Sequence, residues 1–156
     1  MNISEAVREV LHNPVLLAAL GAWALAQALK LPIERARTGQ MNWALLTGTG
    51  GMPSSHSALV CGLATAVGIQ SGFSSPQFAV AAILAMVVSY DAAGIRRAAG
   101  KQANVLNQLI DELAHGHPLR EEQLKEILGH TPIEVLGGAI FGIVVGWAFM
   151  KALQAM

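Results

Sequence analysis

Two short motifs in this chain place a histidine directly in front of a long apolar segment. The first, Pro-Ser-Ser-His at residues 53–56, carries His56, and the second, His-Thr-Pro-Ile-Glu at residues 130–134, carries His130 and Glu134. Histidine titrates near neutral pH, so it can attack an electrophile, donate a proton or bind a metal ion. Four cationic residues flank the same segments and indicate a site for an anionic group: Lys30, Arg37, Arg96 and Arg97.

The first motif has the sequence of a helix start. Serine is favoured at an N-cap, and the first helical turn leaves backbone N–H groups without intrahelical acceptors. Those groups and the helix dipole favour an anion such as phosphate. Ser54 and Ser55 are therefore candidate phosphate-binding residues, although an ordinary loop followed by a helix cap would explain the same residues equally well.

The second motif contains a capping box at residues 131–134, with a proline in the first helical turn. Glu134 can therefore be explained as a helix cap. It also lies four residues after His130, close enough for its carboxylate to orient the imidazole, and an imidazole held at one nitrogen can attack through the other. Both interpretations can hold together.

The composition indicates a membrane protein. The chain has 156 residues, of which 53% are hydrophobic and 13% charged, and its mean hydropathy is +0.48. Residues 38–90 contain no Lys, Arg, Asp or Glu. A soluble domain of this size would need more polar surface, and a net charge of zero argues against nucleic acid as a partner. We expect one membrane domain over residues 1–156.

Four apolar segments predict an all-α integral membrane bundle, because backbone polar groups inside a bilayer must be satisfied within helices. The segments cover residues 14–29, 54–71, 76–90 and 134–150. We expect about four to five transmembrane helices, preceded by an amphipathic lead-in at residues 2–12. Apolar residues recur at helical spacing in the long polar loop, residues 94–129, which predicts amphipathic helices there.

Four successive spans place both long loops on one membrane face and both termini on the other. All the candidate site residues then lie on the loop face. The loops carry more Lys and Arg than the termini do, so the positive-inside rule places them in the cytoplasm. We expect an integral protein of a bacterial-type cytoplasmic membrane, in contact with membrane lipids and with its active-site loops on the cytoplasmic face.

Two histidines, a carboxylate and several cations at one face favour the transfer or hydrolysis of a phosphoryl group. Cations and helical N–H groups would stabilise the equatorial oxygens around phosphorus. One histidine would attack the phosphorus, and the other would protonate the leaving oxygen.

These residues resemble three motifs of the type-2 phosphatidic acid phosphatase and vanadium-dependent haloperoxidase superfamily, and more specifically a divergent branch of it. Lys30 and Arg37 have the spacing of its motif of a lysine, six residues and an arginine. Residues 53–56 differ at one position from its Pro-Ser-Gly-His motif. Residues 130–135 match its pattern His-x-Pro-x-Asp-Val, with glutamate in place of aspartate. The motifs also occur in the order of the family.

The resemblance implies a membrane-embedded, metal-independent phosphatase that hydrolyses a lipid phosphate or diphosphate through a phosphohistidine intermediate, with no cofactor. It implies that His130 is the nucleophile, that Glu134 orients it and that His56 is the general acid. The phosphorylated lipid substrate would be held at its phosphate by Lys30, Arg37, Ser54 and Ser55.

One part of the family pattern is absent. The family has Ser-Arg before the catalytic histidine, with five residues between, and here Gln123 and Leu124 occupy those positions. Arg96 and Arg97 are candidates to replace the missing guanidinium. Two alternatives therefore stay open: a catalytically impaired relative that binds a phosphorylated lipid headgroup for sensing or transport, and a scaffold or assembly factor with a vestigial pocket.

Overall fold

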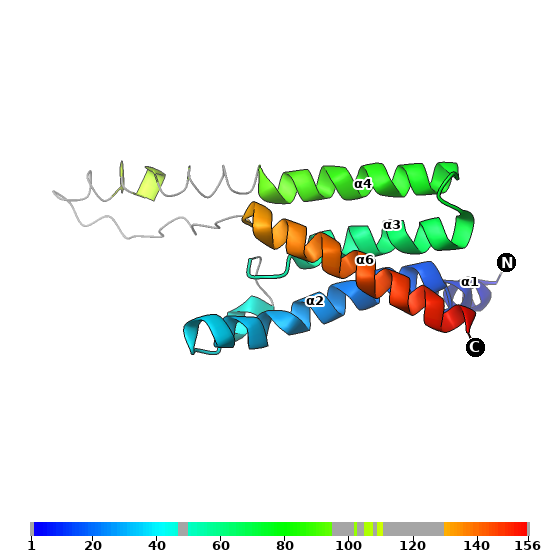
Figure 1. Ribbon diagram of the computed structural model, residues 1–156, viewed down its shortest axis with the longest axis horizontal. Coiled ribbons are helices and arrows are strands. Elements are labelled where there is room, and N and C mark those ends of the chain that lie inside the picture. The colour runs from blue at the N-terminus through cyan, green and yellow to red at the C-terminus, as the bar shows by residue number, and fades with distance from the viewer. Residues whose placement is uncertain are drawn as a thin grey trace.

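The computed structural model describes residues 2–46, 50–94 and 130–155, together with Gln102, residues 105–107 and residues 109–110. Four long helices lie side by side (Figure 1): α2 (Pro14–Thr38), α3 (Ser55–Ser71), α4 (Pro76–Ala93) and α6 (Pro132–Gln154). A short helix, α1 (Ile3–Leu11), precedes them, and a 3-10 turn, η1 (Trp43–Leu46), follows α2. The described part of the chain has helices and no strands, which confirms the predicted all-α fold.

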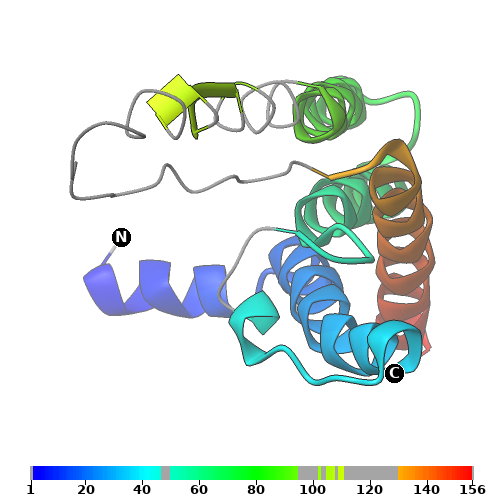
Figure 2. The same cartoon turned by 90° about the vertical axis from the view of Figure 1, so that its left-hand side faces the viewer.

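Helix α3 lies at the centre of the bundle and packs against α2, α4 and α6. Seen end-on, α4 and α2 lie on opposite sides of α3, and α6 lies beside it (Figure 2). Both chain termini and the α3–α4 turn lie at one end of the bundle, and the starts of α3 and α6 lie at the other (Figure 1). This is the arrangement expected from four successive spans.

Three of the long helices begin with the same capping motif, a polar N-cap residue followed by proline. Asn13, Ser75 and Thr131 are the caps of α2, α4 and α6, and each is followed by a proline at the first helical position. The cap side chain accepts a backbone N–H bond from the first turn, and proline needs no such partner. The sequence therefore defines these helix starts locally.

The end of α2 differs from the sequence prediction. The first apolar segment was expected to cover residues 14–29, but α2 continues through Pro32 to Thr38 and is capped by Gly39 with φ of 75°. Proline removes one backbone hydrogen bond and usually breaks a helix. Here the helix continues through it, so Lys30 and Arg37 lie on one continuous helix.

Three helices are long and apolar enough to cross a membrane: α2, α4 and α6, with mean hydropathies of 1.5, 1.4 and 1.9. Helix α3 has 17 residues and spans about 25 Å at ~1.5 Å per residue. It runs alongside the other three and packs against each of them. The expected membrane bundle is therefore confirmed, while the amphipathic helices predicted at residues 94–129 lie largely outside the described residues.

Helix α3 and helix α6 pack through a seam of small residues. Gly138, Gly142 and Gly146 of α6 face Ser54, Ala58 and Gly62 of α3, and each pair lies four residues beyond the previous one on both helices. The two helices are therefore parallel. A Cβ at Gly146 would lie 2.8 Å from the carbonyl oxygen of Gly62, so only glycine permits this separation between the backbones.

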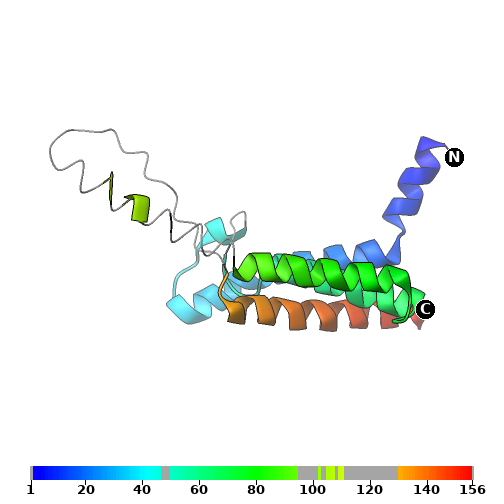
Figure 3. The same ribbon diagram turned by 90° about the horizontal axis from the view of Figure 1, so that it is seen from above.

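Helix α1 extends away from the end of the bundle that carries the termini (Figure 3). None of its residues is buried. Its larger apolar side chains, Ile3, Val7, Val10 and Leu11, recur at helical spacing and are exposed. This is the amphipathic lead-in expected from residues 2–12.

Candidate phosphate-binding and catalytic site

The two histidine motifs meet where α3 and α6 begin. The backbone N–H of Ser54 donates to the carbonyl oxygen of Glu134 at 3.0 Å, which joins the N-cap of α3 to the first turn of α6. Because the helices are parallel, both N-termini point to the same end of the bundle. Each N-terminus carries a partial positive charge and outward-facing N–H groups. Their convergence creates a favourable position for an anion.

His130 is held by Glu134 at this junction. Its Nδ1 lies 3.3 Å from Oε2 of Glu134, and the same oxygen accepts the backbone N–H of Thr131 at 2.9 Å. Thr131 returns a bond by accepting the N–H of Glu134 at 3.4 Å. Both expected roles of Glu134, helix cap and partner of the imidazole, are therefore present in one geometry. His130 is 2% exposed, so little water competes for this contact.

Lys30 lies at the end of a stripe of alanines on α2. Ala18, Ala22 and Ala26 precede it at intervals of four residues, and all three are fully buried. The stripe faces α3, so Lys30 is directed along the α2–α3 interface and is 2% exposed. Its Nζ donates to Oγ of Ser55 at 3.4 Å, and it interacts electrostatically with Glu134. A buried lysine within a membrane bundle indicates a functional site.

The serine side chains of the first motif are engaged within the protein. Oγ of Ser54 accepts the backbone N–H of Ser57 at 3.4 Å and lies 3.1 Å from Oγ of Ser57. Ser55 accepts from Lys30, and all three serines are buried. The hydroxyls therefore organise the first turn of α3.

The residues that lead into α3, Gly51 and Met52, lie beside Lys30 and α6. Gly51 adopts φ of 77°, a conformation that favours glycine, and its ideal Cβ would lie 3.8 Å from Cγ and Cδ of Lys30. Met52 Cε would lie 3.1 Å from a Cβ at Gly137 of α6. The segment before the first motif therefore covers the lysine stem and reaches α6.

Some predicted site residues are not brought into this cluster. Arg37 lies seven residues beyond Lys30 on α2, and it is exposed. His56, by contrast, lies at this junction on the first turn of α3, two residues after Ser54, and it is half-buried. Arg96 and Arg97 lie outside the described residues, as do Gln123 and Leu124.

One polar residue that positions the site was not singled out from the sequence. Gln27 donates through Nε2 to the carbonyl oxygens of Leu45 and Leu46, at 3.0 and 2.7 Å. These bonds attach η1 to α2, close to the turn that leads into the first motif. The sequence did offer a signal for Gln27, because a polar amide within an apolar segment, three residues before Lys30, indicates a structural or functional role. Among the described residues, no group of three or more His, Cys, Asp or Glu could hold a metal ion.

Comparison with known proteins identifies the family. The model of the family described as "Divergent PAP2 family" matches residues 11–145, which include both histidine motifs and Lys30. The chain belongs to the divergent PAP2 family. It is also 43% identical over 148 residues to the "Uncharacterized membrane protein YuiD" of Bacillus subtilis (strain 168), covering 88% of this chain and 94% of that relative. No solved structure matches the chain.

Membership of the divergent PAP2 family agrees with the resemblance drawn from the motifs. The apolar helices and the membrane-protein relative together establish a membrane protein. The family match covers α2, α3, α4 and most of α6, so it includes every described residue of the cluster.

Proposed function

We propose that this divergent PAP2 protein is a membrane-embedded phosphatase that hydrolyses a lipid phosphate or diphosphate. One observation carries the proposal: two parallel helices begin side by side, and their junction holds the His130–Glu134 pair and the buried Lys30. Helix N-termini and a lysine would neutralise the phosphate, and the carboxylate would activate the imidazole.

The first step would be phosphoryl transfer to His130. With Nδ1 held by Glu134, Nε2 attacks the phosphorus, an N–P bond forms and the P–O bond to the lipid breaks. His56, as an imidazolium, gives its proton to the leaving oxygen, so that the lipid leaves as an alcohol or, from a diphosphate, as a monophosphate. Lys30 and the first-turn N–H groups of α3 stabilise the equatorial oxygens.

The second step would release phosphate. Neutral His56 takes a proton from a water molecule as its oxygen attacks the phosphorus, and the N–P bond breaks. His130 returns to its starting state, inorganic phosphate leaves and His56 is again protonated. Each histidine therefore alternates between two states, and no external reductant or oxidant is needed.

A second function, binding of a phosphorylated headgroup without turnover, is favoured by the sequence departure at Gln123 and Leu124. Arginine normally supplies bidentate contacts to phosphate, and Arg37 is exposed in the described structure. Under this function, the same cluster would bind the phosphate but would lack one charge needed in the transition state.

Phosphate release from purified protein in detergent distinguishes the two functions. The substrates are phosphatidate, phosphatidylglycerol phosphate and polyprenyl diphosphate, with vanadate as an inhibitor that mimics five-coordinate phosphorus. We expect His130→Ala to lower turnover on the order of 10³-fold or more, and His56→Ala to lower it less. His12→Ala is the matched control, because His12 lies at the C-terminus of α1, where it contacts Arg8 O.

Three outcomes are informative. Loss of activity in His130→Ala with retained activity in His12→Ala supports the phosphatase. Full activity in His130→Ala removes the proposed nucleophile. Absence of wild-type turnover on every substrate, combined with saturable binding of phosphatidate, favours headgroup binding instead.

A further inference from the structure

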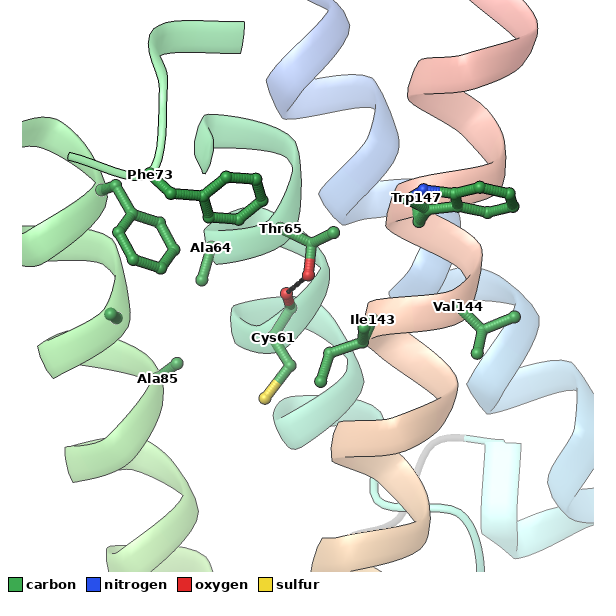
Figure 4. Close-up of a pocket in the computed structure, with 10 residues that line it drawn as sticks. Cys61, Ala64, Thr65, Phe73, Ala85, Ile143, Val144 and Trp147 are labelled. Atoms are coloured by element: carbon green, nitrogen blue, oxygen red, sulfur yellow. Dashed lines mark hydrogen bonds between the residues drawn. The ribbon is translucent and has the colours of Figure 1, made fainter. Parts of the chain in front are cut away.

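A groove of about 650 Å³ lies between α3, α4 and α6, on the side of α3 away from α2 (Figure 4). Ala64 of α3 and Ala82 and Ala85 of α4 line it on one side, and Ile143 and Trp147 of α6 line it on the other. Its volume falls within the range of small-molecule pockets. Helices α4 and α6 make few contacts with each other, and the small side chains leave the space between them open.

The groove offers almost no polar contacts. The only hydroxyl among its lining residues is that of Thr65, which donates to the carbonyl oxygen of Cys61 at 2.8 Å (Figure 4). A polar solute would lose hydration here without compensation. A hydrocarbon chain would lose nothing, because it exchanges lipid contacts for protein contacts.

Two aromatic rings line the groove at its end near the α3–α4 turn (Figure 4). Phe73 and Phe78 meet edge to face, with ring centroids 5.1 Å apart and an interplanar angle of 75°. The ring of Phe73 lies against α3 at Gly68, where an ideal Cβ would come within 2.6 Å of Cδ1. Gly68 therefore makes room for this ring, and the pair forms an end wall at the α3–α4 turn.

The end wall lies at a definite depth below the candidate site. Gly68 follows His56 by 12 residues (68 − 56) on the same helix, which is about 18 Å at ~1.5 Å per residue. The wall therefore lies near the far end of α3, at a distance from the site that a single fatty-acyl chain can span.

We propose that this groove binds a hydrocarbon chain of the phosphorylated lipid held at the His130–Glu134 junction, and that Phe73 and Phe78 limit its length. The inference rests on the proposed phosphate site. Helices α3 and α6 carry both features: Cys61, the first groove residue on α3, follows His56 by five residues. A single fatty-acyl chain spans this distance along α3, whereas a polyprenyl chain is much longer, so the ligand class is a fatty-acyl lipid phosphate and not a polyprenyl diphosphate.

Two substitutions alter the groove in opposite directions. Phe73→Ala removes the end wall, and Ala82→Phe fills the space, because Ala82 is a half-buried lining residue. Phe149→Ala and Ala79→Phe are the matched controls, since neither residue lines the groove. The measurement is turnover of phosphatidates that carry dioctanoyl, dimyristoyl, distearoyl and longer chains.

We expect Phe73→Ala to shift the preference toward longer chains by at least about tenfold and Ala82→Phe to shift it toward dioctanoyl by a similar factor. Both controls should keep the wild-type profile, and dioctanoyl turnover should be unchanged in Phe73→Ala. The same chain-length profile in all five proteins, with His130→Ala inactive, would overturn the groove proposal and leave the phosphatase proposal intact.

A second measurement does not require turnover. A phosphatidate with a photoreactive diazirine at its chain terminus should crosslink to the peptide that contains Phe73, and Lys30→Met should reduce that crosslink. A phosphatidylcholine with the same chain is the control for ordinary lipid contact. Equal labelling by the two lipids would overturn the proposal. If phosphatidate labels this peptide preferentially but the protein shows no turnover, the groove proposal is supported and the phosphatase proposal is contradicted.

Discussion

Helix α3 contacts its neighbours α6 and α4 in two different ways. Toward α6, the glycines at positions 138, 142 and 146 bring the two backbones into contact. Toward α4, the contact is made by the side chains of Val60, Ala64, Ala81 and Ala85, and a groove opens beside them. One side of α3 is a tight seam, and the other is a loosely filled interface.

The difference separates two requirements of the proposed function. Phosphoryl transfer needs its groups held in fixed positions, and a backbone seam allows little displacement. The Ser54–Glu134 hydrogen bond lies at the start of that seam. Accommodation of a flexible hydrocarbon chain instead needs open volume, which small side chains on α4 provide. The α3–α6 seam therefore holds the catalytic groups in place, whereas the α3–α4 side can accommodate chains of different shape.

Among substitutions that compare the two sides of α3, the largest effect is expected from Glu134→Gln at the start of the seam. Glutamine can still cap α6, but it removes the negative charge that holds the His130 imidazole. We expect turnover to fall on the order of 10²- to 10³-fold, with thermal stability in detergent nearly unchanged. Equal losses of activity and of stability would show that Glu134 serves only as a cap.

A smaller effect is expected from Lys30→Met, which keeps the length of the side chain and removes its charge. Hydrogen bonds to charged groups contribute about 1.5–3 kcal/mol, so affinity for phosphatidate or vanadate should fall about 10- to 100-fold. The melting temperature should stay the same or rise, because a buried charge is removed. Lys151→Met is the control, since Lys151 is exposed near the C-terminus and contacts Gln154. Unchanged affinity in Lys30→Met would remove Lys30 from the phosphate site.

The smallest expected effect tests the seam itself through Gly142→Ala. The added Cβ would overlap the carbonyl oxygen of Ala58, and overpacking of this kind costs about 1–3 kcal/mol. Gly21→Ala is the control, because an added Cβ there meets nothing within 4 Å. Ala82→Val, on the groove side, should change stability by only about 0.5 kcal/mol. The contrast between the two sides of α3 disappears if Ala82→Val destabilises as strongly as Gly142→Ala.

Much of the fold could be predicted because its signals are local. Polar caps followed by proline define the starts of α2, α4 and α6, and uninterrupted apolar residues define the membrane bundle. The end of α2 could not be predicted in this way. Pro32 is unfavourable in a helix interior, yet the helix continues to Thr38.

The sequence by itself determined the chemical groups of the site: two histidines at helix starts, a carboxylate four residues after one of them, and a lysine at the end of an apolar segment. These depend on residue type and short spacing. Only the tertiary structure decided that α3 and α6 are in direct contact, that Lys30 points to Ser55 while Arg37 is exposed, and that a groove lies below the site. Those features depend on contacts between residues far apart in the chain, which no local pattern specifies.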